Sequence, residues 1–217
     1  MTVTDKELRE NVMRELEWDP KIDASHIGVI ANGGAVTLTG HVRSYAEKML
    51  AVKAAERVNG VKAVADELEV TLPSTHVRKD AEIAETVART LRWHTLLPDT
   101  IEAEVRNGIV TLKGEVEWSY QRQTAERAVR DITGVRSVIN LITVEPRAKP
   151  EDVKRRIADT IKRNAALDAS AIHVETTNGT VHLEGTVHSL WEKRMAEQAA
   201  ASAPGVKEVD NDLAVVI

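Results

Sequence analysis

The aromatic side chains are the residues of this chain whose chemistry and position best suit a binding surface. There are four tryptophans, two tyrosines and no phenylalanine: Trp18, Tyr45, Trp93, Trp118, Tyr120 and Trp191. They fall near helix ends that we expect to share one end of each repeated unit. A helix N-terminus presents free N–H groups to a phosphate, and aromatic rings suit a membrane interface because one edge stays wet. The six residues therefore predict contact with lipid headgroups, although rings of this kind also cap small cores.

Three histidines near the C-terminus form a second candidate site, for metal binding. His173, His182 and His188 fall on the polar face of two adjacent expected strands, together with Glu175 and Glu184. Imidazole and carboxylate groups are metal ligands. However, the segment has no ligand spacing such as His-x-x-x-His on a helix. A polar sheet face in water, or one packed on a neighbouring unit, explains these residues more simply, so we predict no metal and no cofactor.

The sequence disfavours both catalysis and nucleic-acid binding. It contains no cysteine, no Gly-x-Ser-x-Gly segment, no P-loop and no dinucleotide fingerprint, so we predict that the protein is not an enzyme. The formal net charge is −5, and no repeat is basic. Charge alone is therefore not expected to attract nucleic acid or to hold the chain on anionic lipid.

The elements that position these side chains occur three times. The alternating segment 36–42 recurs at 110–116 and 181–187, with the period of a strand that buries one face. Each copy has one glycine at a buried position and a second glycine further on: Gly40 and Gly60, Gly114 and Gly134, Gly185 and Gly205. The first indicates a bulge or close backbone approach, which we interpret as a helix packed tightly on the strand, and the second is expected to end that helix. The chain is thus predicted to be three copies of one domain, at residues 1–72, 78–145 and 150–217.

Each repeat has the pattern of two helices and three strands. In the first repeat, a Thr4–Glu7 capping box precedes a helical stripe of Leu8, Val12 and Leu16. A strand, an Asn-Gly turn and the glycine-centred strand follow. A second capping box, at Ser44 here and at Ser189 in the third repeat, opens a helix with an alanine-rich inner face. We predict an α+β fold of three αββαβ domains, each with a three-stranded mixed sheet, the glycine strand in its centre and both helices on one face.

The repeated motif resembles the BON domain family, the bacterial osmotically inducible periplasmic protein and nodulation domain. The resemblance rests on Leu38-Thr39-Gly40-His41-Val42 and its two later copies, each followed by a Gly-Val pair. A polar residue of the family pattern appears as Asn140 and Asn211, whereas the first repeat has Asp66. The resemblance covers nearly the whole chain and implies a non-enzymatic αββαβ module.

The resemblance also implies a function. Modules of this family are expected to bind phospholipid surfaces, peripherally, or to join envelope components in osmotic or stress responses. The alternative is a protein-interaction or assembly module that uses three similar surfaces for avidity. The N-terminus has no signal-peptide pattern, so we expect a cytoplasmic protein if residue 1 is the natural start and a periplasmic one if a leader has been removed. The sequence leaves the oligomeric state open.

Overall fold

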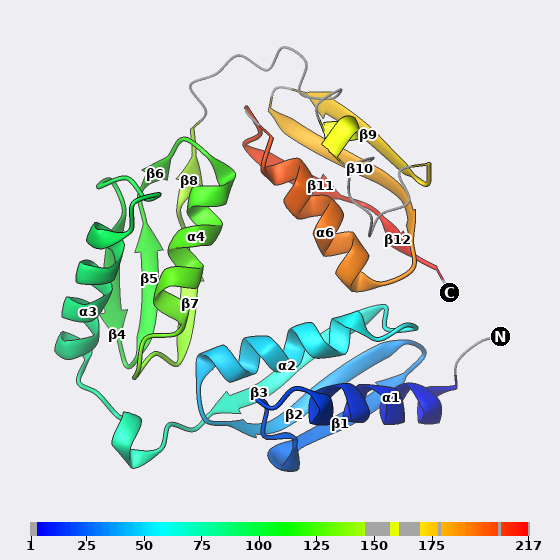
Figure 1. Cartoon of the computed structure of the whole chain (residues 1–217), viewed down its shortest axis with the longest axis horizontal. Coiled ribbons are helices and arrows are strands. Elements are labelled where there is room, and N and C mark those ends of the chain that lie inside the picture. The colour runs from blue at the N-terminus through cyan, green and yellow to red at the C-terminus, as the bar shows by residue number, and fades with distance from the viewer. Residues whose placement is uncertain (1–3, 146–156, 161–169, 178, 204, 217) are drawn as a thin grey trace.

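The computed structural model describes residues 4–145, 157–160, 170–177, 179–203 and 205–216 (Figure 1). The first domain contains α1 (Asp5–Trp18), β1 (Ile27–Asn32), β2 (Ala35–Val42), α2 (Tyr45–Arg57) and β3 (Ala63–Val70), with a short 3-10 turn at Ala24–His26. A 3-10 turn at Ser74–His76 leads into the second domain.

The second and third domains repeat this order of elements. The second contains α3 (Asp80–Trp93), β4 (Glu102–Arg106), β5 (Ile109–Lys113), β6 (Glu115–Val116), α4 (Ser119–Arg130), β7 (Ser137–Asn140) and β8 (Thr143–Val144). The third contains β9 (Ile172–Thr177), β10 (Thr180–Val187), α6 (Leu190–Ala201), β11 (Glu208–Asn211) and β12 (Ala214–Val215). Residues 157–160 are helical.

Each sheet has the glycine-centred strand in the middle. In the first domain β2 pairs antiparallel with β1, where Gly40 lies opposite Ile27, and parallel with β3. In the second domain β5 takes the same place between β4 and β7, and β10 pairs with β9, β11 and β12 in the third. The predicted mixed sheet and strand order are therefore confirmed.

Every domain has its own hydrophobic core between the helices and the sheet. The helical stripe Leu8, Val12 and Leu16 is buried in the first core, as predicted. The inner face of α2 is made of alanines such as Ala51 and Ala55, which are fully buried and let the helix lie close to β2. The equivalent stripe of the third domain is represented by Ile157, which is buried, while Val153 and Ile161 lie outside the described residues.

The central glycines are required by a backbone contact, which corrects the expectation of a tightly packed helix. Gly40 has φ +106°, and a Cβ there would collide with the carbonyl oxygen of His26, just before β1. A Cβ at Gly114 or Gly185 would likewise collide with a backbone carbonyl oxygen that precedes β4 or β9, respectively. The chain enters its first strand across the face of the central strand, so no side chain fits there.

The second glycine lies in the turn after the helix rather than at the helix end itself. α2 ends at Arg57, and Gly60 has φ +96°. This turn packs against the β1–β2 hairpin, where the backbone N–H of Lys62 donates to the carbonyl of Gly34 at 2.8 Å. In the first domain the hairpin turn is Gly33-Gly34, since Asn32 is still paired with Ala35.

The predicted capping boxes form completely at α1 and partly elsewhere. Ser44 and Ser189 accept the N–H of Glu47 and Glu192, both at 3.1 Å. These glutamates bond to the backbone one residue before the cap instead of to the cap itself; Arg43 donates its N–H to Glu47 at 2.7 Å.

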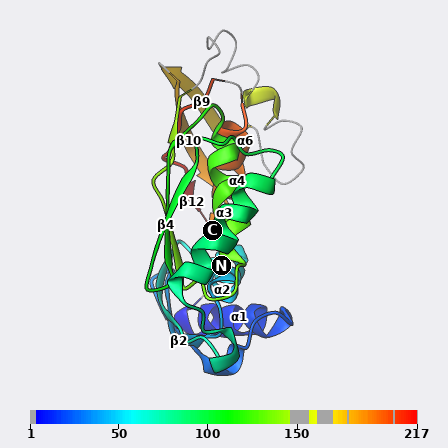
Figure 2. The same ribbon diagram turned by 90° about the vertical axis from the view of Figure 1, so that its left-hand side faces the viewer.

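All three domains place their sheets and helices on the same sides of the molecule. The sheets lie toward one side and the helices toward the other (Figure 2). The second helices α2, α4 and α6 border the centre, whereas α1 and α3 lie on the outside (Figure 1). Contacts between the first and third domains run through α2 and α6. Among the described residues, no helix is both long and apolar enough to cross a lipid bilayer.

Candidate functional site

The end of each first helix lies beside the start of the second, as the sequence predicted. In the second domain the Nε2 of Gln121, in the first turn of α4, donates to the carbonyl of Leu96 at 3.3 Å, just past α3. In the first domain the N–H of Asp23 donates to Glu47 of α2 at 2.8 Å. The helix ends therefore form one surface in each of the first two domains. Most of the segment that the sequence predicts as the first helix of the third domain lies outside the described residues.

The predicted aromatic residues differ in exposure. Trp18 and Trp93, the last residues of α1 and α3, are 84% and 78% exposed, and Trp191 is 37% exposed. Trp118 and Tyr120 are half-buried, with ring centroids 6.3 Å apart and planes tilted by 34°. The structure thus brings several aromatic residues to the same end of the second domain.

This end of the second domain differs in two respects from what is described of the equivalent ends. Leu96, three residues after Trp93, is 53% exposed. Helix α4 begins after Trp118 without a side-chain cap, whereas Ser44 and Ser189 cap α2 and α6. In α4 the equivalent N–H, that of Gln121, donates to the carbonyl of Trp118 at 3.0 Å, so the N–H groups that can donate to a phosphate oxygen are those of Ser119 and Tyr120. We call Trp93, Leu96, Trp118 and Tyr120 the aromatic end.

Tyr45 is buried and is not part of an exposed surface that could contact a ligand. Its side chain is only 8% exposed and belongs to the core of the second domain, with Met49 and Val70 packed against the same core. Burial and the Glu126 carboxylate raise the pKa of Tyr45, while a hydrogen bond with the backbone of Val138 acts in the opposite direction. Tyr45 therefore joins the first domain to the second, and we remove it from the candidate contact residues.

The titration of Tyr45 tests its burial directly. A Tyr120→Phe variant retains Tyr45 as its single tyrosine, and its tyrosinate absorbance should titrate above the ordinary pKa of 10.0. Because folding raises the pKa of Tyr45, the neutral phenol contributes to the stability of the folded protein. This contribution is fully present below the pKa of the unfolded chain and is lost as pH rises through the pKa of the folded protein. The same variant unfolded in urea should titrate at the ordinary value. A folded midpoint at or below that value would show that Tyr45 is exposed.

Helix α2 also joins the first domain to the third. Leu190 of α6 packs on the core of the first domain. Glu56, whose side chain is 7% exposed, forms an ion pair with Arg194, with 2.5 Å between the Nη2 of Arg194 and the Oε1 of Glu56. Burial raises the pKa of Glu56, and the positive charges of Arg194 and Lys53 partly offset that effect. Helix α2 therefore contacts its own sheet on one face and both other domains on the other.

The histidines of the third domain pair with separate carboxylates. His182 lies 3.2 Å from Asp210, and His173 lies 3.4 Å from Glu175. His188, beyond β10, lies 3.5 Å from Glu192. Within the described part of the chain, no three such residues are grouped as ligands of one metal ion.

The polar family position connects the last strand to the second helix, a role that the sequence did not reveal. Asn140 donates to the carbonyl of Arg122 in α4 at 2.9 Å, and Asn211 makes the equivalent bond to α6 at 3.0 Å. Asp66 cannot donate, and Lys48 of α2 compensates by an ion pair at 3.1 Å. The departure from the pattern at Asp66 is thus matched by a charge on the facing helix.

The fold and the glycine positions agree with the comparison with known families. Residues 4–71, 79–146 and 151–217 each match the BON domain, so the chain belongs to the BON domain family and carries three copies. It is similar to osmotically-inducible protein Y from Escherichia coli (strain K12), with 35% identity over 144 residues, which is 62% of this chain and 71% of the relative.

Two solved structures have weaker similarity. One is CdsD, a structural protein of the type III secretion system of Chlamydia trachomatis, with 17% identity, a TM-score of 0.27, and coverage of 95% of this chain and 91% of that chain. The other is the C-terminal domain of CdsD, with 17% identity, a TM-score of 0.26, and coverage of 99% and 100%. At these scores neither similarity carries an inference about this chain.

Proposed function

We propose that the protein is a non-enzymatic binding protein that contacts phospholipid surfaces peripherally through the aromatic end of its second domain, in a stress or osmotic response. The observation that carries the proposal is the exposure of Trp93 and Leu96 beside the uncapped start of α4. The similarity to an osmotically inducible protein supports the stress context.

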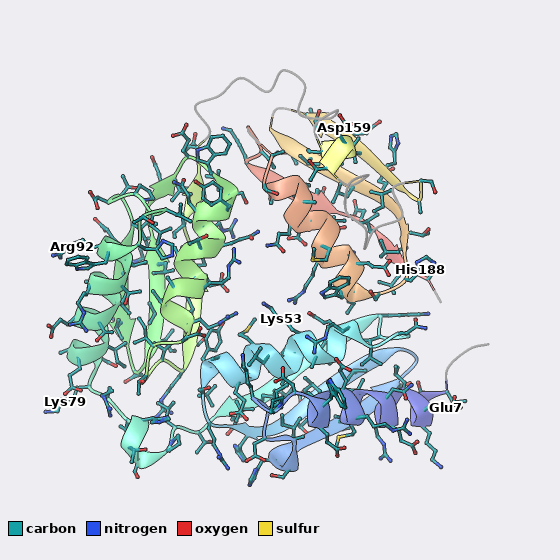
Figure 3. All side chains as sticks on the ribbon, viewed as in Figure 1. Glu7, Lys53, Lys79, Arg92, Asp159 and His188 are labelled. Atoms are coloured by element: carbon teal, nitrogen blue, oxygen red, sulfur yellow. The ribbon has the colours of Figure 1, made fainter. Side chains whose placement is uncertain are left out.

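The physical basis is a combination of apolar and polar groups on one small surface. The exposed rings and Leu96 can enter the boundary between headgroups and acyl chains, where aromatic side chains are favoured. The first-turn N–H groups of α4 can then donate hydrogen bonds to a lipid phosphate, because they carry the positive end of the helix dipole. The side chain of Arg92, beside Trp93, is exposed and adds a positive charge near this end (Figure 3).

Substitution of the exposed tryptophan should weaken vesicle binding. In co-sedimentation with phosphatidylglycerol–phosphatidylethanolamine vesicles, Trp93→Ala should lower the affinity roughly tenfold, because burial of one large apolar side chain contributes about 1.5–3 kcal/mol. Trp93→Ala/Trp118→Ala should lower it further. Trp93 is exposed, so its replacement should leave the thermal unfolding temperature unchanged.

Trp18→Ala is the matched control for this experiment. Trp18 ends the first helix of its domain as Trp93 does, and it is equally exposed. However, Ile22, which aligns with Leu96, is buried there, and so is Tyr45, at the start of the adjacent helix. Its replacement should leave vesicle binding within about twofold of the parent chain. Equal losses in the two variants, or parent-like binding by Trp93→Ala, would contradict the proposal.

A second candidate function is supported by the outer face of the second sheet. Ile109 and Ile139 are 37% and 45% exposed, and Leu141 is 55% exposed, on a sheet side that the helices leave uncovered (Figure 2). An apolar surface of this kind suits a protein partner. If the protein is an assembly module, Ile139→Lys should remove partner binding while vesicle binding is absent or unaffected.

A further inference from the structure

A pocket of about 500 Å³ lies where the second helices of the three domains meet. Its charged lining comprises four basic and two acidic residues: Lys53, Arg127, Arg130, Arg194, Glu126 and Glu197. When the repeats are aligned on Gly40, Gly114 and Gly185, these residues fall in the same two turns of α2, α4 and α6. In Figure 3, Lys53 lies on the side of α2 that faces the centre of the molecule.

The acidic groups at this pocket already have partners in their own domains or behind the lining. Glu126 accepts a hydrogen bond from Asn140 at 3.2 Å, and Glu197 accepts one from Asn211 at 3.4 Å. Glu56, deeper in the joint, is paired with Arg194. These bonds fix the carboxylates without removing their charge, and Arg130 is paired with Asp131 at 3.2 Å. With four basic residues against two acidic ones, the lining still carries an excess of positive charge in a protein whose net charge is −5.

Lys53 shows most clearly that positive charge is in excess. Its side chain is half-buried, and within the described part of the chain it has no ion-pair partner. Burial lowers the pKa of Lys53, and the nearby Arg130, Arg194 and Arg127 lower it further, while Glu56 acts in the opposite direction. Like charges so arranged repel one another, and the repulsion is relieved when an anion lies between them.

We propose that this three-helix pocket binds a small multivalent anion of the phosphate class, held by Lys53 of α2, Arg127 of α4 and Arg194 of α6. One ligand would then contact all three domains at once and would stabilise their arrangement. Arginine suits this role because its planar fork donates two parallel hydrogen bonds to a phosphate. The site is separate from the aromatic end, so the inference does not depend on the proposed membrane contact.

Isothermal titration of the full chain with inorganic pyrophosphate tests the proposal, with sodium chloride holding the ionic strength constant. The parent chain should bind saturably, and Lys53→Met should weaken binding about tenfold or more, because a hydrogen bond to a charged group contributes about 1.5–3 kcal/mol. Without anion, Lys53→Met should unfold at a temperature equal to or above that of the parent, since it removes a like charge. Inorganic phosphate should bind more weakly than pyrophosphate.

Lys79→Met is the matched control, because it removes one positive charge far from the pocket, at the start of the outer helix α3 (Figure 3). It should leave pyrophosphate binding unchanged. Equal losses in Lys79→Met and Lys53→Met, or the absence of saturable binding by the folded parent chain, would overturn the proposal. To separate a free anion from a lipid phosphate, vesicle binding is measured with Lys53→Met. Parent-like vesicle binding supports a free anion, and a loss comparable to that in pyrophosphate affinity contradicts it.

Discussion

Gly40→Ala should destabilise the first domain by about 2–6 kcal/mol, because a strained backbone and an overpacked contact each cost about 1–3 kcal/mol. The methyl group would collide with the carbonyl oxygen of His26, which is backbone and cannot rotate away. In addition, alanine disfavours the observed φ of +106°. Since whole domains are stable by only about 5–15 kcal/mol, urea unfolding followed by circular dichroism should show a separate early transition.

Gly33→Ala provides the control for this prediction. Gly33 also has a positive φ, +59°, but a Cβ there would have nothing within 4 Å. Its replacement should cost about 1–2 kcal/mol, which is the penalty of the left-handed conformation alone. If the two substitutions had the same effect, the close carbonyl contact would not be what selects glycine in the central strand.

Tyr45→Ala should cost about 3–5 kcal/mol, as for other large aromatic side chains removed from a core. Unlike an ordinary core substitution, it should loosen the joint between two domains, since Tyr45 belongs to α2 but is buried in the second core. Hydrogen exchange should therefore accelerate in β7 and α4 as well as in α2. The thermal unfolding temperature should fall in the same variant.

Two variants serve as controls for the Tyr45→Ala prediction. Tyr45→Phe keeps the buried ring and should retain most of the stability, because a hydroxyl hydrogen bond contributes only about 0.5–1.5 kcal/mol. Trp18→Ala removes a larger ring that is 84% exposed, so it should change stability by less than about 0.5 kcal/mol. A Tyr45→Ala effect confined to the first domain would show that the joint is not closed in solution.

Much of the fold could be predicted from the sequence, because every copy must solve the same packing problem. Leu8, Val12 and Leu16 and their counterparts recur because each covers the same sheet. The central strand could be recognised from Gly40 and its two copies. What the glycine contacts could not be predicted, since a carbonyl in the chain entering β1 leaves no signature in side-chain types.

The candidate site was predictable in part for the same reason. The shared helix end followed from the order of elements, so Trp93 and Trp118 could be placed together in the second domain. The sequence showed that Trp118 stands where the other two helices have a capping serine. Which N–H groups are hydrogen-bonded at the start of each helix could be learned only from the structure. The bond from Asn140 to α4 required coordinates, because an asparagine has many partners within reach.

The sequence by itself determined three αββαβ units, their cores and their glycines, since contacts made inside each copy are repeated as residue patterns. The tertiary structure alone decided how the units meet. Tyr45, which aligns with Ser119 and Leu190, and Lys53, which aligns with Arg127 and Gln198, lie at positions where the copies differ. Each copy has different neighbouring domains, so the residues at these positions are not repeated. The sequence therefore offered no pattern from which the contacts between domains could be predicted.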